Sequence, residues 1–128
     1  MTPAAFDFAS PLTWLRCGIA LVWLVFGGLF KALGALPRHR RIIARVVGEA
    51  RAGPVLWLVA TGEVSLGLWM LVGRQLVPCV ALQSVALVAM NALELRFARD
   101  LLLAPRAMLV ANVTLLAAAW YVALAGSS

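Results

Sequence analysis

Glu63 is the residue whose position most strongly suggests chemistry. It is the only charged residue between Gly53 and Gly73, a run about as long as the apolar core of a lipid bilayer is thick. A carboxylate in such a run costs roughly 2.5–3.5 kcal/mol on insertion scales, so a chain that retains one generally gives it a partner or a task. Glu63 is therefore the first candidate site residue.

Other polar side chains are expected in the same leaflet. At ~1.5 Å per helical residue, Glu63 lies about 13 Å and Asn112 about 10 Å from the nearer boundary, with Asn91 somewhat shallower and Lys31 and Glu94 near the boundary itself. We predict that these five residues form a ligand-binding cluster in which Lys31 reaches a carboxylate. The alternative is that Lys31 and Glu94 extend to the headgroups while the asparagines only pair between helices.

The elements that must position this cluster are four apolar stretches. The chain is 64% hydrophobic with a mean hydropathy of +0.98, which is too apolar for a soluble domain. Each stretch is long enough to cross ~30 Å of hydrocarbon as a helix, and the four cover Leu12–Leu36, Pro54–Val72, Gln75–Leu95 and Pro105–Ala125. The sequence therefore predicts an all-α integral membrane four-helix bundle, with residues 1–128 as a single transmembrane domain. The first apolar stretch is too long for a cleaved signal peptide, so we expect it in the mature protein.

The connection between the first two stretches, residues 37–53, has the pattern of a short basic amphipathic interfacial helix. Ile42, Ile43, Val46, Val47 and Ala50 share one face, and arginines occupy the other. We expect contacts with anionic lipid headgroups through Arg38, Arg41 and Arg45. A solvated linker is the alternative.

The distribution of basic residues predicts the orientation in the membrane. Nine of the eleven lie in two connections: Lys31, Arg38, Arg40, Arg41, Arg45, Arg51, Arg96, Arg99 and Arg106. By the positive-inside rule, loops 37–53 and 96–104 are cytoplasmic and both termini are outside. We expect a multi-pass cell-membrane protein, in a bacterial inner membrane, whose net charge of +6 faces lipid rather than nucleic acid. Arg16, near the outer boundary, is expected to reach lipid phosphates.

The residues that commonly bind metals or cofactors are sparse. Cys17 and Cys79 are both expected near the outer ends of their helices, so they either form a disulfide or are small core residues. His39 is the only histidine, which excludes a haem with two histidine ligands from this chain, and we interpret it as a surface residue. The sequence has no metal-spaced cluster and no phosphate-binding loop, so no metal site and no cofactor is evident.

Several short segments also resemble a known family. They are Gly28-Leu29-Phe30-Lys31, Leu36-Pro37-Arg38-His39, Gly62-Glu63, Met90-Asn91-Ala92-Leu93-Glu94, Asp100-Leu101-Leu102-Leu103 and Asn112. With them the chain resembles the DoxX-like family of small four-helix membrane proteins from about Arg16 to Tyr121. The resemblance implies a four-helix bundle and a link with membrane redox systems, because the family is named after a subunit of a thiosulfate:quinone oxidoreductase. One departure is Arg99, where a proline often precedes the aspartate.

Three functions remain open from the sequence. The first is an accessory or anchor subunit of a membrane redox system, with a quinone or another lipid-soluble ligand at the polar cluster and a redox partner protein; the chain has no catalytic motif, so it is at most a subunit of an oxidoreductase. The second is a small proton-coupled carrier that uses Glu63 and forms a homo-oligomer. The third is a structural or assembly factor in which the polar cluster only fixes the helix register.

Overall fold

The computed structural model describes residues 9–32, 37–102 and 104–125, with the backbone alone for residues 30–32, and these ranges are almost entirely helical. The elements are α1 (Pro11–Leu24), the π-helical η1 (Val25–Ala32), α2 (Pro37–Val47), α3 (Glu49–Val72), α4 (Leu76–Phe97), the 3₁₀ turn η2 (Arg99–Leu101) and α5 (Pro105–Ala125). Within these ranges, four helices are long and apolar enough to cross a membrane. The predicted all-α membrane bundle is confirmed.

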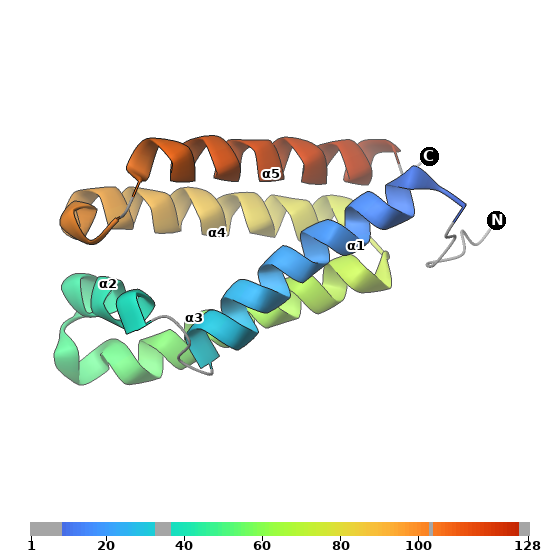
Figure 1. Cartoon of the computed structure of the whole chain (residues 1–128). Helices are drawn as coiled ribbons and strands as arrows, with labels where there is room; N and C mark the ends of the chain where they lie inside the picture. Colours follow the sequence, from blue (N-terminus) through green and yellow to red (C-terminus); the bar gives the residue numbers. More distant parts are fainter. Residues whose placement is uncertain (1–8, 33–36, 103, 126–128) are drawn as a thin grey trace.

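The spanning helices form two pairs. α1 and η1 pack along α3, and α4 packs along α5 (Figure 1). The pairs meet near the start of α1 and the end of α5, which lie at the same end of the bundle, and they diverge toward the other end. There α2 fills the space between α3 and α4, contacting both. The divergence leaves room for a cavity at the end of the bundle that carries α2.

Small residues let α1 approach α3 closely. A β-carbon on Gly67 would lie 3.0 Å from the backbone oxygen of Ala20 and 2.9 Å from Leu24 Cγ. Lipid provides no hydrophobic driving force between helices, so the van der Waals contacts that this close approach allows hold α1 and α3 together. Trp23 and Gln83 complete this core, where the Trp23 indole Nε1 donates a hydrogen bond to Gln83 Oε1 at 3.0 Å.

Three helix boundaries differ clearly from the sequence prediction. The first span stops being α-helical at Leu24 and continues as a π-helix at its two consecutive glycines, while residues 33–36 lie outside the described ranges. The interfacial helix is present and basic, but it ends at Val47 because Gly48 adopts a φ of 91°. α3 therefore begins at Glu49 rather than at Pro54, and Pro54 lies inside the helix, just after its first turn. The position of α2 in the headgroup plane stays a prediction.

Arg16 does not reach outward, so that expectation is wrong. The side chain is only 8% exposed, and its Nη2 donates a hydrogen bond to the backbone oxygen of Leu71 at 3.3 Å. Gly73, whose φ is 81°, ends α3 directly beneath the guanidinium. A cation at this position compensates the negative end of the α3 dipole and its unpaired carbonyls. Cys17 and Cys79 are free thiols, so they form no disulfide. Cys79 is a buried core residue, as the alternative predicted, whereas Cys17 is only half-buried.

Candidate ligand-binding site

A cavity of about 460 Å³ occupies the space between the two helix pairs. All five α-helices and η1 contribute to its wall, which is mainly apolar, and its polar lining comes from Arg38, His39, Glu63, Asn91, Glu94 and Asn112. The structure thus brings together four of the five candidate residues. The fifth, Lys31, lies in η1 with its side chain outside the described atoms, so its contact with a carboxylate stays a prediction.

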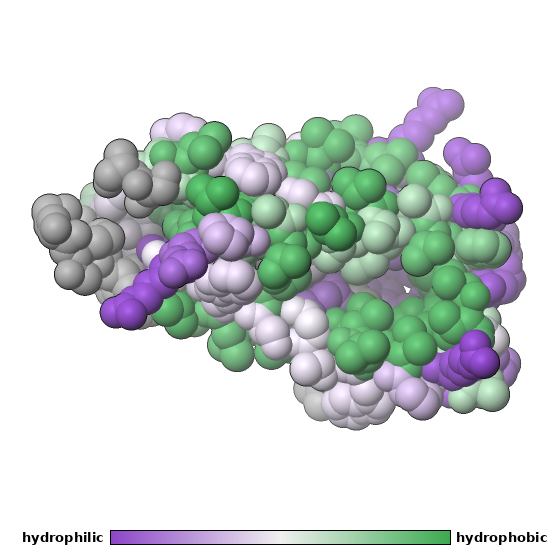
Figure 2. Space-filling view, turned by 180° about the vertical axis from the view of Figure 1, so that it is seen from behind, coloured by the Kyte–Doolittle hydropathy of each residue, from purple (hydrophilic) through white to green (hydrophobic). Residues whose placement is uncertain are grey.

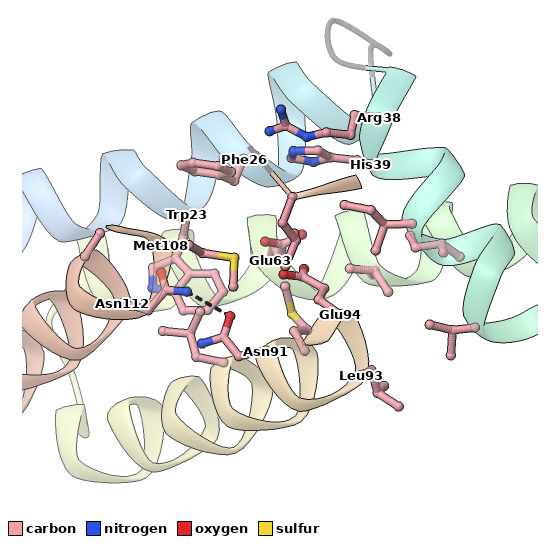
Figure 3. A pocket seen from close by; sticks show the side chains of 18 of the residues that line it. Trp23, Phe26, Arg38, His39, Glu63, Asn91, Leu93, Glu94, Met108 and Asn112 are labelled. Carbon is pink, nitrogen blue, oxygen red and sulfur yellow. Dashed lines mark hydrogen bonds between the residues drawn. The ribbon is translucent and has the colours of Figure 1, made fainter. Parts of the chain in front are cut away.

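Glu63 is positioned by the contact between η1 and α3. Its side chain is 5% exposed and lies opposite Gly27, where a side chain would collide with α3. π-helical turns inside helices occur frequently at functional sites. Figure 3 shows the carboxyl groups of Glu63, from α3, and Glu94, from α4, directed into the same cavity.

Asn91 and Asn112 form the opposite wall. Asn112 Nδ2 donates a hydrogen bond to Asn91 Oδ1 at 2.9 Å, which joins α4 to α5 (Figure 3). From the sequence, this pairing was only part of the alternative to a ligand-binding cluster, and the structure shows that the pair forms. Because Asn112 provides the donor of this bond, the Asn91 amide group keeps its own N–H donors for other contacts.

α2 contributes two residues that sequence reasoning missed. His39 is half-buried in the cavity wall and stacks on Phe26, with ring centroids 6.1 Å apart and planes 8° from parallel. The interpretation of His39 as a surface residue was wrong, and Arg38 lines the cavity beside it. Arg38 precedes Ile42 by four residues, and His39 precedes Ile43 by four. Residues at this spacing share a helix face, which is the signal that could have placed both on the apolar side of α2.

The other side of α2 is held by an ion pair outside the spans. Arg45 donates from Nη1 to Asp100 Oδ1 at 2.8 Å and from Nη2 to Asp100 Oδ2 at 2.9 Å. The hydrogen bond from Arg45 holds the pKa of Asp100 below its ordinary value, and the same bond raises the pKa of Arg45. The pair connects α2 to η2, so Arg45 has a partner within the chain. Contact of Arg38, Arg41 and Arg45 with anionic lipid stays a prediction.

The cavity extends to the flank of the bundle. Three of its lining residues, Val22, Phe26 and Leu93, are also partly exposed on the outer surface. Figure 2 shows hydrophobic side chains over most of the flank, with a hollow between them, and hydrophilic side chains gathered at the end that carries α2. The part of the cavity wall that reaches the flank is therefore apolar.

The chemistry available in the cavity is hydrogen bonding and proton exchange. Carboxyl, amide, imidazole and guanidinium groups all meet there. Among the described residues, no group of three or more His, Cys, Asp and Glu side chains is arranged to hold a metal ion. None of these side chains transfers electrons by itself, so redox chemistry would have to come from a ligand or a partner.

Comparison with known proteins adds one match. A model of the DoxX-like family matches residues 20–120, a range that includes every residue of the cavity wall. No curated protein matches the chain, and no solved structure does.

Proposed function

We propose that this chain, which belongs to the DoxX-like family, is a multi-pass membrane protein that binds a lipid-soluble ligand by its polar head in the cavity. In this proposal the chain is the accessory or anchor subunit of a membrane redox system, and its ligand is a quinone. The observation that carries the proposal is the convergence of polar side chains from α2, α3, α4 and α5 on one apolar cavity.

The size and lining of the cavity support ligand binding. Small-molecule sites typically measure about 300–1,000 Å³, with mostly apolar walls and a few placed polar groups. The volume of about 460 Å³ falls in this range, and the hydrophobic side chains outnumber the polar ones in the wall. Such a site suits an apolar body with a small polar head.

Two features of the α2 side of the cavity support the choice of a quinone in this proposal. The parallel rings of Phe26 and His39 lie at its wall and offer a flat surface for a planar ring. Arg38 Nε is a buried donor with no hydrogen-bond partner in the described part of the chain, and a ligand carbonyl oxygen would supply one. A bound quinone would supply the electron transfer that these side chains lack, while Arg38 and His39 hold and orient its carbonyl oxygens.

The test is to purify the protein in mild detergent and to identify co-purifying lipid-soluble molecules by mass spectrometry. Glu63→Gln replaces the buried carboxyl group by an amide of nearly the same shape. The matched control is Glu49→Gln, because the Glu49 side chain is 80% exposed and lies outside the cavity. We expect a quinone in the wild type and in Glu49→Gln, and much less of it in Glu63→Gln.

Other outcomes would favour the remaining functions. Glu63 is a buried carboxyl group inside a membrane span, the feature that a proton-coupled carrier needs. Proton-dependent uptake by reconstituted vesicles, lost in Glu63→Gln, would favour the carrier. The structural role would be favoured by three results together: no molecule co-purifies with any of the proteins, the vesicles show no transport, and Glu63→Gln alters only the thermal stability.

A further inference from the structure

We infer that the cavity recognises the head of its ligand as a hydrogen-bond donor, so that it prefers a lipophilic phenol to the matching methyl ether. This inference rests on the proposed function and specifies the ligand chemistry of the same site: it favours the reduced form of a quinone head, whose hydroxyl groups donate, over the oxidised form, whose carbonyl oxygens only accept. It concerns the side of the cavity formed by α3 and α4, which carries the carboxyl groups of Glu63 and Glu94.

The two carboxyl groups make this side of the cavity rich in acceptors. An ionised carboxylate only accepts hydrogen bonds, at about four lone-pair positions, so it can accept from a ligand in addition to its contacts within the chain. Two carboxyl groups that share one proton still leave several acceptor positions. A ligand hydroxyl supplies a donor here, whereas an ether oxygen adds another acceptor.

The depth of Glu63 strengthens this preference. Its side chain is 5% exposed, so a ligand that reaches it leaves water behind. Hydrogen bonds to charged acceptors are short and about twice as strong as neutral ones, and an apolar surrounding makes a missing bond more costly. Discrimination between a hydroxyl and a methoxy head is therefore expected to be large.

The α2 side of the cavity favours an aromatic head over an ammonium group. Facing the carboxyl groups are Arg38 and His39 on α2, while the α5 residues in the wall carry no titratable group. The guanidinium of Arg38 offsets part of the attraction that the two carboxyl groups exert on a cation. The stacked rings of Phe26 and His39 favour a flat aromatic ligand instead. A phenolic hydroxyl combines a neutral donor with such a ring.

The experiment compares three probes with the purified protein in one detergent: 4-octylphenol, its methyl ether 4-octylanisole, and octylammonium. Binding is followed by calorimetry, and titrations of each probe into the same detergent without protein correct for partition into micelles. We expect the phenol to bind the wild type at least about tenfold more tightly than the ether. Glu63→Gln should remove most of this preference, and Glu49→Gln should keep it.

The outcomes separate this inference from the proposed function. Equal binding of phenol and ether overturns the inference and leaves a ligand-binding cavity in place, whereas no binding of any probe overturns both. Tighter binding of octylammonium than of the phenol overturns the choice of a neutral head. If Glu63→Gln does not fold, Glu94→Gln takes its place, and an unchanged preference for the phenol in a folded Glu94→Gln counts against the inference.

Discussion

Gly27 and Glu63 lie in direct contact between η1 and α3. A β-carbon on Gly27 would be 2.8 Å from Glu63 Cβ and 2.9 Å from the backbone oxygen of Ala60, distances that real side chains do not adopt. Only glycine fits at this position without movement of one of the two helices. The contact fixes the backbone of Glu63 against η1, and the carboxyl group is left to extend into the cavity.

Replacing Gly27 by alanine should therefore destabilise the protein. The added methyl group collides with backbone atoms, which cannot rotate away, so we expect a loss of about 1–3 kcal/mol. Gly28→Ala is the matched control, because a β-carbon there meets only Val64 Cγ2 at 3.8 Å. Thermal unfolding in detergent measures both variants, and equal melting temperatures would show that η1 and α3 are not held as tightly as the structure indicates.

The Arg45–Asp100 pair should make stability depend on pH in the acid range. The pKa of Asp100 is lowered in the folded protein from its ordinary value of 3.8, chiefly by the hydrogen bond from Arg45. Its stabilising contribution is therefore complete above that value and is lost as the pH falls through the folded pKa. Because both side chains are exposed, the contribution should be small and should decrease in salt.

The measurement for this pair is the melting temperature of the wild type and of Asp100→Asn from about pH 6 to about pH 3. Other carboxyl groups titrate in the same range, so the informative quantity is the difference between the two proteins. We expect that difference to shrink as the pH falls. A difference that stays constant over the range would mean that the pair does not form in detergent.

The hydrogen bond between Asn91 and Asn112 should couple α4 to α5. Pairs of this kind in membranes contribute about 0.6 kcal/mol on average and up to ~1.7 kcal/mol. We expect Asn91→Ala, Asn112→Ala and the double variant to show a positive coupling energy of that size in a thermodynamic cycle. Additive losses would indicate that the two amides are bound separately, by water or lipid.

The spans and part of the site follow from the sequence because they depend on local properties. Continuous apolar runs predict spanning helices wherever they are long enough, and all four are confirmed. Similar depth placed Asn91 and Asn112 in one leaflet, and their hydrogen bond was part of the alternative interpretation of the polar cluster. Charge in an apolar run identified Glu63, and the structure places it in the wall of the cavity.

The residues that were misjudged depend on how separate helices meet. His39 lies in a basic segment that looks like surface, and only the docking of α2 between α3 and α4 turns it inward. Arg16 looks like a residue that reaches lipid phosphates, and only the end of α3 beside it provides the carbonyl that it binds. Neither position follows from hydropathy or spacing within one helix, because the partner belongs to another part of the chain.

Gln83 illustrates how such a partner sets the effect of a substitution. It is fully buried, accepts a hydrogen bond from Trp23 Nε1 at 3.0 Å, and directs its Nε2 toward Cys79 Sγ at 3.3 Å. Gln83→Leu keeps a side chain of similar volume but leaves the Trp23 N–H without its acceptor. The loss of this acceptor should destabilise the protein by about 1–3 kcal/mol. The double variant Trp23→Phe/Gln83→Leu removes the donor as well. It should recover part of that loss, except for the cost of replacing the indole by the smaller phenyl ring. Chemical or thermal unfolding of the wild type, both single variants and the double variant in the same detergent tests this. A double variant that is less stable than Gln83→Leu by the full effect of Trp23→Phe alone would show that the hydrogen bond contributes nothing.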